Sequence, residues 1–223
     1  MATQTDVSTK PRAPLSRERV LRAALVLADM GGIESLTMRK LGRELQVEAM
    51  SLYNHVAGKA DILDGIADLV FSEIAVPSDR ADWKTAMRQR AISARDALLR
   101  HRWAPSLMLS RDKRGPATLR HHDAVLGTLR KAGFTLVMTA HAVSVIDSYI
   151  YGFALQQTNM LLHTPAQVSE VGEHILRQLA GEYLHLAELI TDHAMKPGYE
   201  YSDEFEFGLD LILDGLERLR GAG

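Results

Sequence analysis

The nine histidines are the side chains of this chain best suited to acid–base chemistry or metal binding. His121 and His122 are adjacent, so on a helix their rings would point about 100° apart and would be poorly placed to share a metal ion. His185 and His193 lie eight residues apart and could share a helix face, but only one Glu-x-x-His pair, Glu182 and His185, accompanies them, whereas a di-metal bundle site needs two. The histidine spacing therefore favours neither a metal site nor an acid–base pair.

Other patterns of catalysis are also missing from the sequence. It contains no phosphate-binding glycine loop, no nucleophile elbow and no His-Glu-x-x-His motif. Its 223 residues include no cysteine, which excludes disulfides and thiolate metal sites. We therefore expect a protein that is not an enzyme and that uses no metal and no cofactor.

Residues 37–59 point to a different chemistry, because their spacing predicts two short helices joined by a tight turn. Leu41 and Leu45 would stack on one face, and Val47 and Leu52 would close over them. The second helix, at about residues 48–54, would leave short polar side chains exposed, as contacts to DNA phosphates and base edges require. An ordinary helical hairpin with a solvated face would show the same pattern.

The sequence around this segment resembles the N-terminal domain of TetR-family transcriptional repressors. Three blocks in register carry the resemblance, 15–25, 31–41 and 52–63, within a match over about residues 15–72. It implies a three-helix DNA-binding head and a fourth helix, from about Ala60, that connects the head to a regulatory body. Gln46 departs from the family, which usually has glycine at this turn position; a positive φ there would cost about 1 kcal/mol.

Within this head, residue chemistry suggests distinct roles in DNA binding. We expect Arg39 to contact guanine O6 and N7, and Lys59 to hold a phosphate. Short polar side chains would face the groove or the backbone, and the apolar ones could touch a thymine methyl group. The expected DNA contacts are Thr37, Arg39, Ala49, Met50, Ser51, Tyr53, Asn54, His55 and Lys59.

Charge and composition agree with a DNA-binding head on a larger body. Residues 1–60 hold nine Lys/Arg and six Asp/Glu, although the whole chain has a net charge of −2. Positive charge is therefore concentrated where DNA phosphates would lie. Hydrophobic residues make up 46% of the chain, with no apolar run of transmembrane length and no secretory signal in our reading. We expect a cytoplasmic protein that binds no membrane.

We predict an all-α chain in three parts. These are a flexible N-terminal arm over residues 1–14, a helix-turn-helix DNA-binding domain over 15–75 with the motif at about 37–56, and an α-helical effector-binding and dimerisation domain over 76–223. Thr164 and Gln167 suggest a capping box, and Ser202 a helix cap. Beyond the head, the periodicity and caps predict helices at 60–75, 82–100, 104–109, 115–131, 135–159, 164–193 and 202–220.

The last predicted helix has an apolar stripe that suits either internal packing or self-association. Segments 133–153 and 205–217 resemble the C-terminal domain of the tetracycline-repressor subgroup, in which the matching two helices of each subunit form a four-helix dimer interface. The resemblance implies a homodimer on palindromic double-stranded operator DNA, with half-sites about 34–36 Å apart. The expected interface residues are Tyr149, Gly152, Phe205, Gly208, Leu209, Ile212, Gly215 and Leu216.

The resemblance further implies a repressor that leaves its operator when a small-molecule effector enters the body. The type member of the subgroup binds a magnesium–tetracycline chelate partly through a histidine. Met108 occupies that position here, and a thioether is a poor magnesium ligand, so we expect a different effector. The alternative is an effector-independent regulator, or an activator, of the same fold. The candidate effector contacts, each of which could instead be a core or interface residue, are His101, Trp103, Met108, His141, Asp147, Tyr151 and Gln156.

Overall fold

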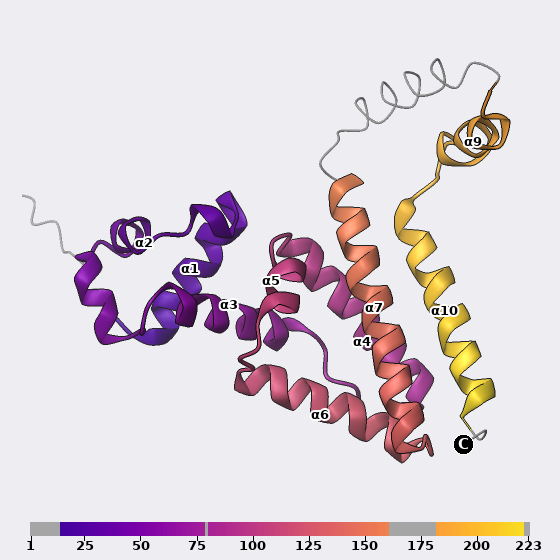
Figure 1. The fold of residues 1–223 in the computed structure, drawn as a ribbon, viewed down its shortest axis with the longest axis horizontal. Coiled ribbons are helices and arrows are strands. Elements are labelled where there is room, and N and C mark those ends of the chain that lie inside the picture. Colours follow the sequence, from indigo (N-terminus) through magenta and orange to yellow (C-terminus); the bar gives the residue numbers. More distant parts are fainter. Residues whose placement is uncertain (1–13, 79, 161–181, 221–223) are drawn as a thin grey trace, which may run out of the picture. The chain divides into compact units, whose positions relative to one another are not determined.

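The computed structural model describes residues 14–78, 80–160 and 182–220, and within these ranges it is helical and contains no β-strand (Figure 1). The all-α prediction is confirmed. The α-helices are α1 (Arg17–Gly31), α2 (Met38–Leu45), α3 (Lys59–Glu73), α4 (Trp83–Arg100), α5 (Ala104–Ser110), α6 (Pro116–Lys131), α7 (Leu136–Met160), α9 (Leu184–Leu189) and α10 (Tyr201–Leu219). Two 3₁₀-helices lie at Ile33–Ser35 and Ala49–Asn54, and a π-helix at Ile190–Ala194.

The chain divides into two compact units, which we call the head, up to Ile66, and the body, from Ala67. This division falls inside α3, so the first half of that helix belongs to the head and the second half to the body. The domain boundary that we expected after residue 75 lies just beyond the end of α3.

The head folds around the apolar residues that its sequence spacing identifies. Thr37 accepts a hydrogen bond from the backbone N–H of Lys40 and so caps the start of α2. Arg17 donates to both carboxylate oxygens of Asp61, at 2.6 and 2.9 Å, and ties the start of α1 to the start of α3. The buried apolar side chains of the head include Val20, Ala24, Leu36, Leu41, Leu52, Val56, Ile62 and Ile66.

In the body, α7 packs against α4, α6 and α10, and α10 also packs against α4 (Figure 1). The apolar faces of these helices form the core of the body. Each of the four helices contributes large side chains to this core at helical spacing. Its largest fully buried side chains are Met87, Leu98, Leu129, Phe134, Ile146, Ile150 and Phe205.

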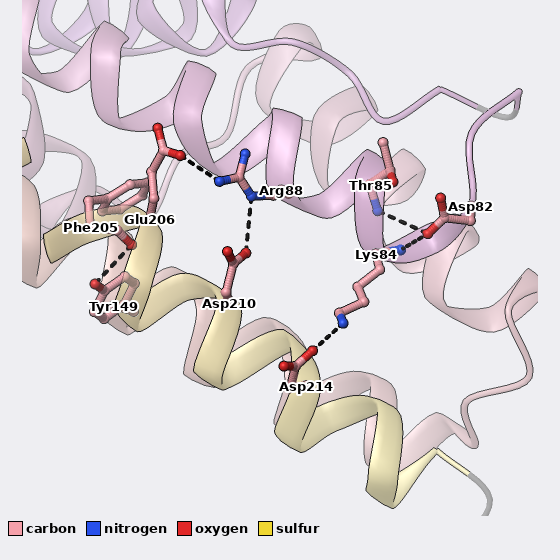
Figure 2. A network of polar contacts seen from close by, with 9 residues as sticks. All are labelled: Asp82, Lys84, Thr85, Arg88, Tyr149, Phe205, Glu206, Asp210 and Asp214. Carbon is pink, nitrogen blue, oxygen red and sulfur yellow. Dashed lines mark hydrogen bonds and ion pairs between the residues drawn. The ribbon is translucent and has the colours of Figure 1, made fainter. Parts of the chain in front are cut away.

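Figure 2 shows ion pairs that join the exposed sides of α4 and α10. Arg88 lies 2.5 Å from Glu206 and 3.0 Å from Asp210, and Lys84 pairs with Asp214. These side chains are partly exposed, so each pair contributes little to stability compared with the core beneath them. Their main effect is to fix the register of α10 along α4.

Several helix ends differ from the predictions. The helix α10 begins at Tyr201 without a side-chain cap, so the prediction that Ser202 caps it is wrong. The capping box at Thr164 lies outside the described residues. Within the described part of the predicted 164–193 helix, the chain forms α9 and then a π-helix, two short elements where one long helix was expected.

The helix α7 is apolar enough, over Leu136–Asn159, to cross a membrane by length and composition alone, with a mean hydropathy of 1.2. The prediction that the chain has no apolar run of this length is therefore wrong. The same composition suits a helix that packs against several others, because most of its circumference then meets apolar neighbours. The helix α7 does contact α4, α6 and α10, but only 28% of its apolar window is buried within the single chain.

Candidate functional site

The turn between α2 and the next helix is built by two residues with unusual backbone demands. Gln46 has φ 57° and ψ 44°, so it adopts the left-handed conformation although it carries a side chain. Gly42 has no side chain, and a Cβ there would lie 2.9 Å from the carbonyl oxygen of Val47 and 3.2 Å from the nitrogen of Ala49. The absence of a side chain at Gly42 therefore allows the second helix to approach α2 closely.

The second helix of this helix-turn-helix is a 3₁₀-helix, Ala49–Asn54, where an α-helix was expected. Leu52 and Val56 are buried and anchor it to the head. Met50 and Tyr53 are 75% and 48% exposed, and Asn54 is also exposed. The segment therefore presents a polar and partly aromatic surface to the outside of the head.

The other expected DNA contacts differ in exposure. Thr37, Arg39 and Lys59 are exposed, whereas Ala49, Ser51 and His55 are half-buried. On α2, Lys40 and Arg43 are exposed beside Arg39 and add positive charge to the same element. Such a set of cations suits a phosphate backbone, and a bidentate guanidinium suits a guanine edge.

The body contains a cavity of about 480 Å³, which we call the body cavity. Its wall is formed by α5, by the loop that follows α5, by α6 and by α7, and all of these belong to the body. Its wall contains both apolar and polar side chains, as in sites that bind small molecules. Its lining residues are Met108, Leu109, Arg114, His122, Ser144, Asp147, Ser148, Tyr151, Gly152 and Leu155.

A buried polar cluster supports one side of the body cavity. The guanidinium of Arg90, only 3% exposed, lies 2.7 Å from Oδ1 of Asp147 and also donates to Nε2 of His121 at 3.1 Å. Burial, and then the charge of Arg90, lower the pKa of His121 to about 3, so this ring is neutral at pH 7. Because Asp147 is already paired, the cluster is close to electrically balanced.

Tyr151 and Arg114 give the body cavity its hydrogen-bond donors. Burial, and then the charge of Asp147, raise the pKa of Tyr151 to about 12, so its hydroxyl keeps its proton. Arg114 is exposed and lies near enough to Tyr151 to lower that pKa slightly. A ligand in the cavity would therefore meet a phenol, a guanidinium and two serine hydroxyls beside apolar side chains.

Three of the residues that the sequence suggested as effector contacts line the body cavity, namely Met108, Asp147 and Tyr151. The structure places the other candidates elsewhere: His101 hydrogen-bonds with Glu73, and Gln156 accepts a bond from Tyr201. Trp103 is buried near the ring of His101, and His141 is exposed on α7 outside the cavity lining. The remaining side chains of the wall meet only through the packing of helices, and sequence spacing did not indicate them: Leu109, Arg114, His122, Ser144, Ser148 and Leu155.

The structure also changes the interpretation of the apolar stripe on α10. Phe205, Leu209 and Leu216 are buried within the single chain, where they pack in the core of the body. Gly208 lies against the hydroxyl of Tyr149, and a Cβ at this glycine would overlap that hydroxyl, so both residues make an internal contact. Of the other expected interface residues, Ile212 is half-buried, Gly215 has open space around it and Gly152 lines the body cavity.

Comparison with known proteins identifies the family. Residues 76–220, about two thirds of the chain, match the model of the tetracyclin repressor-like C-terminal domain. The chain belongs to the TetR family. This TetR-family protein is therefore a DNA-binding transcriptional regulator, in a family of regulators rather than enzymes.

Individual relatives cover both units of the TetR-family chain. It is 33% identical over 225 residues to the HTH-type transcriptional repressor DrrR1 of Streptomyces coeruleorubidus, which covers 95% of this chain and 81% of the relative. It is 32% identical over 211 residues to the class C tetracycline repressor protein of Escherichia coli, over 92% of each chain. The structure of ActR from Streptomyces coelicolor in complex with actinorhodin is similar, with a TM-score of 0.77, 26% identity, and coverage of 94% of this chain and 100% of ActR.

Proposed function

We propose that this protein is a homodimeric repressor that binds a palindromic operator and that a small-molecule effector releases from DNA. The observation that carries the proposal is the body cavity, about 480 Å³, in a member of a family of DNA-binding regulators. A cavity of this size accommodates a drug-sized organic molecule. The repressor would act in the cytoplasm, where it has access to its operator.

The proposed DNA-reading surface is the helix-turn-helix and the residues that flank it. Arg39 would contact a guanine edge, while Lys59, Thr37 and Tyr53 would hold phosphates. Exposure of the Arg39 and Lys59 side chains supports these roles. The left-handed turn at Gln46 supports them too, because it allows the short helix to project its polar side.

Self-association is supported by apolar side chains that the single chain leaves exposed on α10. Phe207 is 65% exposed and Leu211 is 58% exposed, four residues apart on one helix face. Side chains of this size on one face commonly mark a protein interface. We infer that α10 uses this face, rather than the buried stripe of Phe205 and Leu209, to contact a second copy of the chain.

The proposed effector is a small molecule other than the magnesium–tetracycline chelate. Met108 lines the body cavity, and its thioether is a poor ligand for magnesium. The one carboxylate in the lining, Asp147, is already paired with Arg90. An organic molecule that fills the apolar part of the cavity and hydrogen-bonds with Tyr151 fits this wall better than a metal chelate does.

In vitro selection from random double-stranded DNA, with the full-length protein, tests the proposed function. The selected sequences are expected to be palindromic. Arg39→Ala should then weaken binding by about 1–3 kcal/mol and relax the preference at one position per half-site. Lys59→Ala should weaken binding to all sequences alike and lower the salt slope by about 1. Selection of no consensus, or equal effects of both substitutions on every sequence, would contradict a sequence-reading head.

A further inference from the structure

The carboxylate of Asp68, on the body half of α3, caps the first turn of α6. Its Oδ2 accepts a hydrogen bond from the backbone N–H of Ala117 at 3.1 Å, and its Oδ1 accepts from the N–H and the hydroxyl of Thr118, both at 2.8 Å. A carboxylate in this position satisfies backbone donors and the positive end of the helix dipole. Helix α6 therefore takes its cap from another helix, α3.

Gly115 makes this arrangement possible. It occupies the position where a helix usually supplies its own capping side chain, and it has none. A Cβ on Gly115 would overlap the carboxylate of Asp68. The backbone φ of Gly115 is −82°, which any residue adopts, so the need for glycine here comes from the close approach of Asp68.

The hydrogen bonds continue from Thr118 to the wall of the body cavity. Nδ1 of His122 lies 2.8 Å from the carbonyl oxygen of Thr118. A carbonyl oxygen only accepts, so Nδ1 carries the proton, and Nε2 of a neutral His122 ring is a hydrogen-bond acceptor. Because His122 lines the body cavity, three residues connect the cavity to α3: His122, Thr118 and Asp68.

A contact between aromatic rings also joins α3 to His122, in addition to these hydrogen bonds. Phe71 lies three residues after Asp68 on α3 and is buried, and its ring centroid is 5.4 Å from that of His122 and 5.7 Å from that of His121. In close-packed surroundings a ring cannot turn or shift without moving the ring that it touches. Displacement of His122 therefore acts on α3 through Phe71 as well as through Asp68.

We propose that Asp68, Thr118 and His122, with Phe71, form the link through which the body cavity controls α3, and we call them the α3–α6 clasp. This inference rests on the proposed function, since it assigns the effector's action to that same cavity. The closed clasp belongs to the DNA-binding state. An effector that hydrogen-bonds to Nε2 of His122, or displaces its ring, opens the clasp and frees α3, whose first half is part of the DNA-binding head.

A double-mutant cycle on DNA affinity tests the clasp without knowledge of the effector. The full-length protein and its selected operator DNA are titrated by fluorescence anisotropy, with the active fraction of each variant fixed by stoichiometric titration. Asp68→Ala and His122→Ala should each raise the dissociation constant by about 5- to 20-fold, which lies in the lower part of the range of typical allosteric couplings. The dissociation constant of the double variant should be no higher than the higher of the two single-variant values, because both changes open the same clasp.

Matched variants separate the clasp from a general loss of stability. Asp123→Ala removes a carboxylate that is exposed on α6 and has no hydrogen bond or ion pair among the described residues, and it should leave the dissociation constant unchanged. Asp68→Asn should restore most of the affinity, because its amide oxygen still accepts from Thr118. Gly115→Ala should reproduce Asp68→Ala. If Asp68→Ala does not fold, Thr118→Val, which removes only the hydroxyl bond, replaces it in the cycle.

The clasp would be overturned by any of three results. These are losses of binding free energy that add up in the double variant, unchanged DNA affinity in both single variants, or tighter DNA binding by either single variant. These results leave the proposed function standing, because wild-type protein still binds its selected DNA. Failure of the wild-type protein to select any DNA sequence would overturn the proposed function, and the clasp with it.

Discussion

Arg90 and Asp147 form a charge pair inside the body, with Nη1 of the arginine 2.7 Å from Oδ1 of the carboxylate and Arg90 only 3% exposed. The pair joins α4 to α7, and Asp147 also lines the body cavity. Charges in such surroundings are costly unless they are paired. Asp147 is therefore held in the cavity wall by its pairing with Arg90.

Removal of one partner of this pair should strongly destabilise the protein. Arg90→Met leaves Asp147 without its counter-charge and should lower the free energy of unfolding by about 3 kcal/mol. The double variant Arg90→Met with Asp147→Leu should recover most of that loss, because no uncompensated charge remains. Urea unfolding of both variants checks this. Equal losses in the single and double variants would mean that packing, rather than charge, explains the effect.

His121 should make the protein less stable as the pH falls. Its pKa is about 3 in the folded protein and about 6.5 in the unfolded chain, so protons bind the unfolded chain first. The stabilisation is fully present above pH 6.5 and is lost between pH 6.5 and 3, by at most about 1.4 kcal/mol per pH unit. His121→Gln keeps an acceptor for Arg90 but does not titrate. The free energy of unfolding of the wild-type protein minus that of His121→Gln should therefore fall from pH 7 to pH 5. A difference that stays constant with pH would contradict this.

Two glycines of α10 should respond in opposite ways to the same substitution. Gly208→Ala places a methyl group against the hydroxyl of Tyr149, which donates to the carbonyls of Glu204 and Phe205, and should cost about 1–3 kcal/mol through overpacking. Gly215 has open space, so Gly215→Ala should stabilise the helix by about 0.5–1 kcal/mol. Thermal unfolding of the two variants provides the comparison. The prediction fails if Gly208→Ala is the more stable of the two.

The turn of the helix-turn-helix should gain stability from the family's usual residue. Gln46 has φ 57°, which costs a residue with a side chain about 1 kcal/mol. Gln46→Gly removes this strain but makes the unfolded chain more flexible, so the net gain should be about 0.5 kcal/mol. Gln46→Val, whose branched side chain tolerates positive φ poorly, should destabilise the head. Denaturant unfolding should rank the three proteins Gly, Gln, Val in decreasing stability; any other order contradicts the strain argument.

Local signals in the sequence were sufficient to predict the head. The stacking of Leu41 and Leu45 and their cover by Leu52 depend on a few neighbouring residues, and all three side chains are buried in the structure. The helix type of Ala49–Asn54 was missed, because six residues carry too little periodicity to separate a 3₁₀-helix from an α-helix.

The body was harder to predict because its sites form between helices that are distant in the sequence. His122 lines the cavity only because α6 packs against α7, and Asp68 caps α6 from about 50 residues away. The stripe with Phe205 and Leu209 has the same spacing in a core as in an interface, so periodicity alone left the choice open. Packing of α10 against α4 and α7 resolves it in favour of the core.

The central claim, that a ligand in the body cavity controls DNA binding, is tested most directly by the operator dissociation constant with and without a ligand. A thermal-shift screen of small molecules, with actinorhodin and tetracycline with and without magnesium among them, supplies the ligand. At saturation the dissociation constant should rise by about 5- to 150-fold, and bound operator should weaken ligand binding by the same factor. Magnesium–tetracycline should have no effect. A ligand that binds in the cavity but leaves operator affinity unchanged would contradict the account and favour an effector-independent regulator.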